Sequence, residues 1–436
     1  MVLSAMNTGV SGLQAEDQAL SVAGDNIANV DTVGFKEQRA IFEDVLGHSI
    51  LAGTASSIPG SGVRVGSVQQ EFTQGSITNT GVSTDVALNG DGFFVVNGTV
   101  DGVTGNFYTR AGQMNIDANG NLVNSTGLNV QGYAANADGT LQAAVTSLKV
   151  PTSSLAPHAT TTATITANLD TNANASDGAI LTAAWDAQNP TQTSNYSTSM
   201  TVYDSLGSAH TMDVYFRRTG TNTYEYHALV DGNDVNPPSP GTNVEVGTGT
   251  LNFTTNGALN DVTTTTPISV SFNGATGAQA IDLDFGKSIT AGGTGLDGTT
   301  GFASPSSVSS QSQDGYASGD FSGVSIDGTG LVQGLYTNGQ KIAIGQLAVA
   351  KFRSNDGLGR AGQNVWIETR DSGTAAIGKA GTGGRAAVTA GALEASNVDL
   401  ATEFVSLIQH QRAFSANSKT ITTADDMLQE LINIKR

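Results

Sequence analysis

The sequence contains no cysteine, and its 19 Lys and Arg are outnumbered by 38 Asp and Glu. Without cysteine there is no disulfide framework, no Cys-ligated metal site and no thiol catalysis, although the redox compartment stays undecided. The formal net charge of −19 argues against nucleic acid as a partner, because binding a phosphate backbone needs clustered basic residues. Charged residues make up only 13% of the chain, whereas glycine occurs 54 times. This composition predicts short strands joined by tight turns.

Long apolar runs are also absent. No stretch has the roughly 18 consecutive apolar residues of a membrane-spanning helix, so we expect no membrane insertion. Residues 1–10 lack the basic residues and the continuous apolar run of a cleavable signal peptide. Sequence rules alone therefore predict a cytoplasmic protein, or one exported by a route that uses no cleaved signal. At 436 residues the chain has room for two or three domains.

Motifs that would support catalysis or cofactor binding are incomplete. The five histidines show no metal-ligand spacing; they are His48, His158, His210, His227 and His410. Residues 373–380 have the spacing of a phosphate-binding loop, but Ala380 stands where a magnesium-binding Ser or Thr belongs. Residues 117–121 resemble the start of a calcium loop, but the glycine comes two places too early and the closing Glu is missing. We therefore predict no metal site, no cofactor and no enzymatic activity.

Apolar residues recur every seven positions at both ends of the chain, which is typical of helices that pair with other helices. The N-terminal stripe consists of Met6, Leu13, Leu20 and Ile27, with Leu3 and Val10 on the flanking seam. The C-terminal stripe consists of Leu400, Leu407, Phe414, Ile421 and Leu428, with a second seam of Phe404, Gln411, Ser418, Asp425 and Ile432. These stripes are the predicted assembly interface.

Neither terminal helix is expected to be stable alone. The second C-terminal seam is polar in its middle, where a stable two-stranded coil is apolar. Gly9, Gly12 and Gly24 each cost the N-terminal helix up to about 1 kcal/mol relative to alanine. Ser396 or Asn397 is expected to cap the C-terminal helix. From spacing alone the stripes either pair with other subunits or pack on the β core of their own monomer.

The region between the helices alternates apolar and polar residues, as half-buried antiparallel strands do. The clearest runs are Met212, Val214 and Phe216; Tyr224, Tyr226 and Ala228; Ile268, Val270 and Phe272; and Ile281, Leu283 and Phe285. Gly232, Gly257 and Gly274 each follow Asp or Asn and are expected to supply the positive φ of tight hairpins. Residues 151–315 hold 14 Asp and Glu against three basic residues, which is −11 of the total −19. We interpret this acidic segment as an insertion.

The predicted fold class is mainly β with terminal α-helices, in a nested multi-domain chain with a coiled-coil-like inner domain and two β-rich outer domains. The predicted parts are a terminal helical assembly domain (1–35 plus 396–436), a connecting linker region (36–85 plus 353–395), an inner β domain (86–150 plus 316–352) and an inserted acidic outer β domain (151–315). This order predicts that the two termini lie together, at the opposite pole from the insertion.

Short segments at both ends match a known family. They are S-G-L at 11–13, D-N-I-A-N at 25–29, T-V-G-F-K at 32–36, L-E-A-S-N-V-D-L at 393–400, Q-R-A-F at 411–414 and A-N-S-K at 416–419. Interior matches are D-G-F-F-V-V at 91–96 and Y-T-R-A-G at 108–112. The chain resembles the axial proteins of the bacterial flagellum, the rod and hook subunits. The matched signature adds Asn26, Asn29 and Phe35 to the predicted interface.

Within that family the chain is most similar to the hook proteins. Q-D-G at 313–315 and G-D at 319–320 resemble the point where hook proteins re-enter their first β domain, and distal rod proteins are much shorter. Asp31 departs from the signature, where Asn is more usual, but both residues make the same side-chain turn contacts.

The resemblance implies a structural subunit that polymerises into a curved, flexible hollow tube, a universal joint that transmits torque from rod and motor to filament. It implies export by the type III apparatus without a cleaved signal peptide, and an extracellular location in the hook. The implied partners are further copies of the chain and the distal rod, hook cap and hook–filament junction proteins. Two alternatives stay open: a distal rod protein, and a β-rich surface adhesin.

Overall fold

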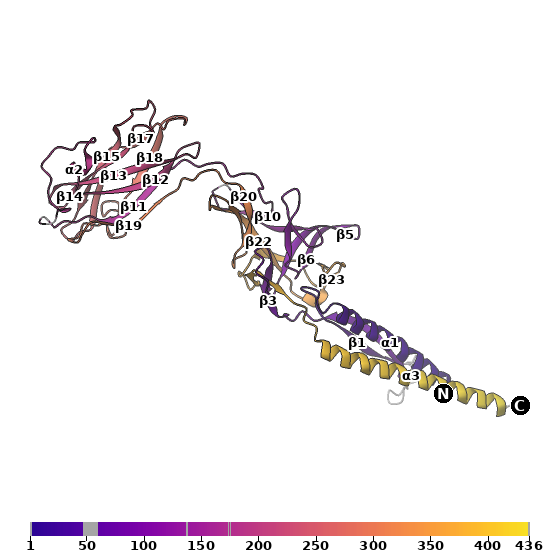
Figure 1. Cartoon of the computed structure of the whole chain (residues 1–436). Coiled ribbons are helices and arrows are strands. Elements are labelled where there is room, and N and C mark those ends of the chain that lie inside the picture. The colour runs from indigo at the N-terminus through magenta and orange to yellow at the C-terminus, as the bar shows by residue number, and fades with distance from the viewer. Residues whose placement is uncertain (1, 47–59, 137, 173, 175, 435–436) are drawn as a thin grey trace. The chain divides into compact units, whose positions relative to one another are not determined.

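The computed structural model describes residues 2–46, 60–136, 138–172, 174 and 176–434. The chain forms two compact units (Figure 1): the first comprises residues 1–152, 322–335 and 341–436, and the second residues 153–321 and 336–340. Strands dominate both units and a long helix stands at each end of the chain, so the predicted fold class is confirmed. Residues 47–59 of the predicted linker region, His48 among them, lie outside the described residues. The predicted four-part division stays a prediction.

The terminal helices, α1 (Val2–Ala28) and α3 (Leu400–Ile434), pack side by side in the first unit and run in opposite directions (Figure 1). The predicted cap of α3 is wrong by two to three residues. Asp399 caps it, because its Oδ1 accepts a hydrogen bond of 2.9 Å from the Thr402 N–H. Asn397 instead donates its side-chain amide to the Glu71 backbone oxygen. Among the described residues no helix is long and apolar enough to cross a membrane.

A β-hairpin follows α1 and lies beside it. Its strands, β1 (Gln38–Leu46) and β2 (Gly60–Gln70), pair antiparallel with Gln38 opposite Gln70, and the register shifts twice along the ladder. The Ser11 hydroxyl of α1 accepts a hydrogen bond of 3.3 Å from the Val63 N–H of β2. The hairpin thus extends the contact surface of the helix pair.

The rest of the first unit is built on a twelve-stranded sheet. Its strands are β5 (Phe93–Val100), β6 (Val103–Thr109), β7 (Met114–Ile116), β8 (Leu122–Asn124), β9 (Asn129–Ala135), β10 (Leu141–Ser147), β20 (Phe321–Ile326), β21 (Leu331–Tyr336), β22 (Lys341–Lys351), β23 (Gly359–Arg360), β24 (Trp366–Ile367) and β25 (Ala376–Lys379). Two short ladders pair β3 (Ile77–Asn79) with β27 (Ala392–Glu394), and β4 (Val86–Asn89) with β26 (Ala387–Ala390). A single 3-10 turn, η1, spans Asn355–Gly357. An aromatic cluster of Phe93, Tyr108, Phe352 and Trp366 lies in the core.

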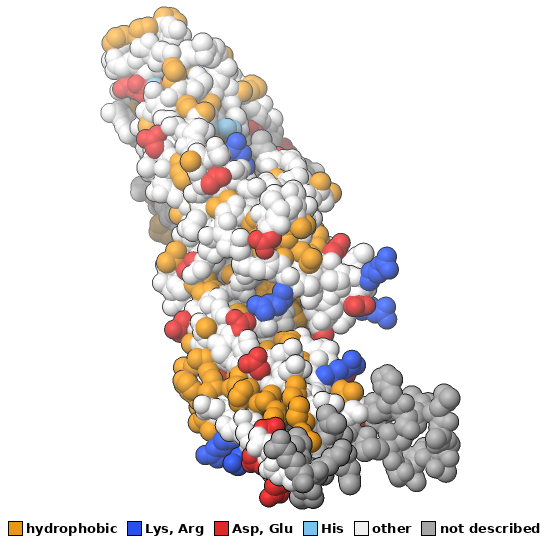
Figure 2. Space-filling view, turned by 90° about the vertical axis from the view of Figure 1, so that its right-hand side faces the viewer, with side chains coloured by type: hydrophobic (Ala, Val, Ile, Leu, Met, Phe, Trp, Pro, Cys, Tyr) orange, Lys and Arg blue, Asp and Glu red, His pale blue; other side chains and the backbone are white. Residues whose placement is uncertain are grey.

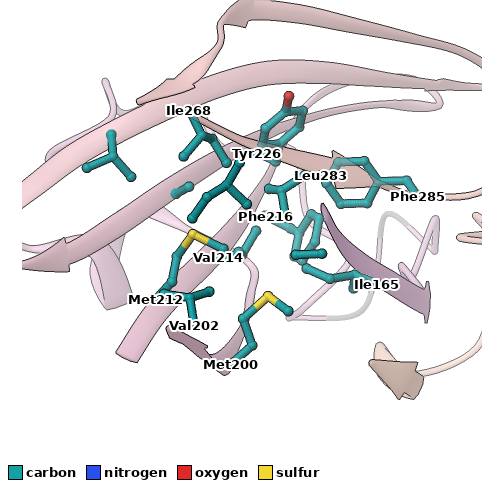
Figure 3. Close-up of a cluster of buried hydrophobic side chains, with 14 of the residues drawn as sticks. Ile165, Met200, Val202, Met212, Val214, Phe216, Tyr226, Ile268, Leu283 and Phe285 are labelled. Carbon is teal, nitrogen blue, oxygen red and sulfur yellow. The ribbon is translucent and has the colours of Figure 1, made fainter. Parts of the chain in front are cut away.

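The second unit packs two sheets against each other. One contains β11 (Thr162–Asn168), β17 (Ile268–Val270), β18 (Gln279–Asp284) and β19 (Ser307–Gln313), and the other contains β12 (Tyr196–Tyr203), β13 (Ala209–Gly220), β14 (Thr223–Asp231), β15 (Asn243–Phe253) and β16 (Leu259–Thr266). The short helix α2 (Pro190–Thr193) precedes β12. Figure 3 shows side chains from both sheets converging, with Phe216 and Tyr226 of one near Leu283 and Phe285.

The alternation predicted for this region is confirmed, because all twelve apolar residues of the four runs are buried. The turn prediction is confirmed for Gly257 and Gly274, whose φ angles are 79° and 89°. It is wrong for Gly232, which does not have a positive φ. That glycine serves a close approach instead, since a Cβ there would lie 2.0 Å from the Ser239 backbone oxygen.

Candidate assembly interface

Apart from Asn26, the buried residues of α1 whose side chains are described are small. They are Gly9, Gly12, Ala15, Ala19 and Ala23, and the two glycines pack against α3. The helices approach so closely that a Cβ on Gly12 would lie 2.6 Å from Asn417 Nδ2, and one on Gly9 would lie 2.8 Å from Ile421 Cγ1. The glycines that weaken α1 as an isolated helix therefore permit its contact with α3.

The predicted stripe of α1 lies beside these small residues. Met6, Leu13, Leu20 and Ile27 are half-buried, and Val10 is exposed. Leu3 belongs to α1, but its side chain lies outside the described residues, as does that of Ile432 in α3. The α1 stripe is thus only partly covered within one chain.

The predicted residues of α3 fall on two faces. Leu407, Ile421 and Leu428 are half-buried, and the contact of Ile421 with Gly9 places it toward α1. Leu400, Phe404 and Phe414 are exposed. Figure 2 shows hydrophobic side chains gathered on the surface at the helical end of the first unit.

The first turns of α3 carry a compact apolar patch. We define the α3 patch as Leu400, Phe404, Val405 and Ile408, whose exposed fractions are 41%, 51%, 56% and 46%. Val405 and Ile408 were missed by the sequence analysis, which followed only the two heptad seams. Helical spacing of four residues could have found them, because residues 400, 404 and 408 share one face of a helix.

A polar contact joins the middles of the two helices. His410 of α3 lies with Nδ1 2.7 Å from Glu16 Oε2 of α1, and both side chains are mostly buried. The His410 ring also stacks on Phe42 of β1, with 6.1 Å between ring centroids. This histidine thus contacts α1, the hairpin and its own helix.

The three residues that the family signature adds to the predicted interface have their contacts inside the chain. Asn26 is buried and donates from Nδ2 to Glu403 Oε1 at 3.0 Å and to the Gln38 backbone oxygen at 2.7 Å. Asn29 donates to Asp25, one turn earlier in α1, and Phe35 is buried. These contacts give all three residues a structural role within one copy.

Three buried charges join the end regions to the β-sheet. Glu394 forms ion pairs with Lys36 at 2.7 Å and with Arg110 at 3.2 Å, and none of the three side chains is more than 2% exposed. Lys36 also donates to the Thr73 backbone oxygen at 2.6 Å. Burial lowers the pKa of Lys36, and the Glu394 carboxylate opposes this shift. We call these residues the charge triad.

The turn that delivers Lys36 explains a glycine of the signature. Gly34 has a φ of 69°, and a Cβ on it would lie 2.6 Å from the Arg110 carbonyl carbon. Its N–H donates to the Glu394 backbone oxygen at 2.8 Å. All three triad residues stand in the signature segments, but the sequence does not reveal their role, because only the fold brings them together.

Nothing in the described part of the chain resembles a metal centre, since no group of three or more His, Asp or Glu is placed to hold an ion. A polar cavity of about 490 Å³ lies between the end of α1 and β24, with Asp25, Asn29, Arg360, Asn364 and Trp366 among its lining residues. Its lining shows no cofactor-binding motif.

Comparison with known families gives four matches that together span both ends and the middle of the chain. They are the Flagella basal body rod protein (residues 6–36), the Flagellar hook protein FlgE/F/G D1 domain (87–173), the Flagellar basal body protein FlaE D2 domain (168–316) and the Flagellar basal body rod FlgEFG protein C-terminal (389–434).

Curated relatives match over the whole length. The flagellar hook protein FlgE of Escherichia coli (strain K12) is 38% identical over 437 residues, covering 99% of this chain and 100% of that protein. The protein of the same name from Treponema pallidum (strain Nichols) is 32% identical over 487 residues, covering 100% of both. The chain belongs to the flagellar hook protein family.

The charge triad connects segments that match different family models. Lys36 lies in the matched rod segment, Arg110 in the D1 domain and Glu394 in the C-terminal segment, so the charge triad joins three family segments.

Among solved structures, the crystal structure of Helicobacter pylori flagellar hook protein FlgE2 is 14% identical, with a TM-score of 0.49, over 71% of this chain and 98% of that one.

Proposed function

We propose that this chain is the structural subunit of a bacterial flagellar hook, which polymerises into a curved, hollow tube that transmits torque from rod to filament. The observation that carries the proposal is the similarity to hook proteins over 99% of the chain. The match of residues 168–316 to the FlaE D2 domain favours a hook over a distal rod subunit. The role is structural, and the chain needs no cofactor for it.

The proposed surface between copies is the α3 patch together with the outward part of the α1 stripe. Burying a Leu, Ile or Phe side chain completely stabilises by about 1.5–3 kcal/mol, so covering the exposed half of one yields about 1 kcal/mol. The four residues of the patch thus offer about 4 kcal/mol per copy before the entropy of association is counted. Because many copies meet in a polymer, this amount is multiplied along the tube.

The helix pair within one chain and the contact between chains use different faces. Ile421 lies toward α1, whereas Phe404 and Ile408 are exposed. A subunit can therefore keep its helix pair while its apolar patch binds a neighbour. The proposed inner layer of the tube consists of such pairs.

The proposed location is the extracellular hook, reached through the type III export apparatus without a cleaved signal peptide. The proposed partners at the ends of the tube are distal rod, hook cap and hook–filament junction proteins. Support comes from membership in the flagellar hook protein family.

The test is the double variant Phe404→Asp/Ile408→Asp, with Gln409→Asp as a matched control at an exposed polar position of the same turn. We expect both variants to be secreted and to keep the helical circular dichroism of the parent. Only the control should polymerise, as seen by electron microscopy and sedimentation, and its tubes should be curved. If the double variant formed curved tubes in normal yield, the proposed surface would be refuted. Straight tubes from the unaltered chain would instead favour a distal rod subunit.

A further inference from the structure

Two carboxyl groups meet where α3 begins. Glu403 lies in the first turn of α3, and Glu37 directly precedes β1, at the far end of the sequence. The carboxyl groups are within hydrogen-bonding distance, with Glu403 buried and Glu37 half-buried. Two ionised carboxylates in such a site would repel, so one of them must hold a proton for the contact to form.

The surroundings decide which carboxyl holds the proton. Asn26 Nδ2 donates to Glu403 Oε1 at 3.0 Å, and the N-terminal turn of a helix favours a negative charge. Burial, followed by the charges of Glu403 and Glu71, raises the pKa of Glu37 to about 7, while Arg39 opposes the shift. Glu37 is therefore the donor of the pair.

Other charged groups around the pair are already engaged. Arg39 and Glu71 pair with each other at 3.3 Å. Asp25 of α1 pairs with Arg360 at 3.6 Å. The side chain of Gln38 hydrogen-bonds to both residues and so connects this second pair to the site. The described structure thus places no free basic side chain against the two carboxyls.

The pair sits inside a network of hydrogen bonds that joins three elements. The Glu37 N–H donates to Asn397 Oδ1 at 2.7 Å, just before α3. The Gln38 N–H, the first of β1, donates to Asn26 Oδ1 at 2.9 Å, near the end of α1. The start of α3, the end of α1 and the start of the hairpin therefore meet at this corner.

We propose that Glu37 and Glu403 form a proton-dependent latch that holds the first turn of α3 against the end of α1 and the start of β1. When the proton is present, Glu37 donates to Glu403 and the corner closes. When it leaves, two carboxylates face each other and the first turn of α3 loosens. The α3 patch begins on that turn at Leu400 and continues to Ile408, so the consequence for assembly rests on the proposed function.

The direction of the pH dependence follows from linkage. A carboxyl that holds its proton more tightly in the closed state than in the open state stabilises the closed state fully in acid. That contribution falls as the pH rises from the ordinary glutamate range toward about 7, and it is gone above neutrality. The latch is therefore closed in mildly acidic medium and open in alkaline medium.

The experiment is hydrogen exchange on the full-length monomer at about pH 6 and about pH 8, corrected for the intrinsic exchange rates. The amides to follow are Gln38 N–H, bonded to Asn26, and Glu403 N–H, bonded to the Asp399 backbone oxygen at 2.9 Å. In the unaltered chain their opening constants should rise by up to about tenfold over this interval. In Glu37→Gln the rise should vanish, because the amide donates at every pH.

Glu43→Gln is the matched control, since Glu43 is an exposed carboxylate on the same hairpin, paired with Arg64. It should retain the full pH dependence. The same rise in Glu37→Gln as in the unaltered chain would overturn the latch. If Glu37→Gln does not fold, carbon-13 NMR of the Glu37 carboxyl in the unaltered chain decides: a midpoint near 7 supports the latch, and one near the ordinary glutamate value overturns it.

This measurement separates the latch from the proposed function. It uses the monomer, so a chain that forms no polymer at any pH would refute the assembly surface and leave the exchange result valid. A polymerising chain without pH-dependent exchange at this corner would refute the latch alone.

Discussion

Replacing Glu394 by glutamine would leave two buried cations without their anion. The side chain keeps its size, but Lys36 and Arg110 lose the carboxylate that both contact within 3.2 Å. Removing one partner of a buried ion pair costs about 3–5 kcal/mol, because the remaining charge stays desolvated. Lys36 can release its proton, whereas Arg110 cannot. We therefore expect Glu394→Gln to destabilise the first unit by about 3–5 kcal/mol.

The matched variant is Lys36→Met, which keeps the pair between Arg110 and Glu394. Its cost should be about 1–3 kcal/mol, mostly because the Thr73 backbone oxygen loses its 2.6 Å bond to Lys36 and keeps only the 3.4 Å bond from the Asn397 amide. The double variant should cost less than the sum, because Lys36→Met removes one of the two charges that Glu394→Gln leaves unpaired. Chemical unfolding of the monomer, monitored by hydrogen exchange at the Gly34 amide, measures the free energy of unfolding of the two single variants and the double variant.

The pH dependence provides a second check. Burial already lowers the pKa of Lys36, and losing the carboxylate lowers it further. In the window between that lowered value and the ordinary lysine value the unfolded chain binds more protons, so the stability of Glu394→Gln should rise with pH. A cost below about 1 kcal/mol for Glu394→Gln, constant with pH, would refute the reasoning.

Three further predictions concern the helix pair and the second unit. Gly12→Ala should weaken the pairing of α1 with α3 by about 1–3 kcal/mol through overpacking. Gly24→Ala, whose Cβ would meet nothing within 4 Å, should instead stabilise α1 by up to about 1 kcal/mol. Thermal unfolding compares the two variants, and a change in stability of the same sign for both would contradict the close approach of the helices. His410→Ala should raise amide exchange in the middle of α3 in the monomer, and unchanged exchange would show that the contact with Glu16 contributes nothing. The Leu155 N–H donates to the Gly319 oxygen at 2.7 Å, so a short Gly-Ser linker can replace residues 156–318 between neighbouring ends. This variant should still be secreted and polymerise, but its tubes should be straight or irregular. Loss of all polymer from a folded, secreted chain would show that the second unit is needed for docking.

The sequence predicted the parts of the fold that depend on local pattern. Alternation placed Phe216 and Leu283 in the core of the second unit, and heptad spacing located both terminal helices. Partner choice was not predictable in this way. The seven-residue stripe says that a helix pairs, but the part of α1 that meets α3 includes Gly9 and Gly12, residues that a hydrophobicity pattern ignores.

Contacts between distant segments were equally hidden. Lys36, Arg110 and Glu394 each stand in a short signature, and no local rule pairs charges across such separations. The hairpin that begins at Gln38 lay in the predicted linker region, because its alternation of apolar and polar residues is weak. Long-range polar contacts of this kind come from the topology of the fold.

The distribution of side chains in the helical pair is the reverse of that in a self-contained helical hairpin. There, the large apolar side chains would face the partner helix and the small or polar ones would face water. Here, Gly9, Gly12 and the contact between Glu16 and His410 lie on the inner face beside Ile421, whereas Phe404, Val405 and Ile408 are exposed. Such a pair gains little from its own contact and much from a neighbour, because the apolar area that remains to be buried lies outside. Within α3 the exposed apolar area is largest near the start, at Leu400, Phe404, Val405 and Ile408, with Phe414 and Met427 further along. A pair built in this way is stabilised further by any surface that covers these side chains, which is what the proposed role as a polymerising subunit requires.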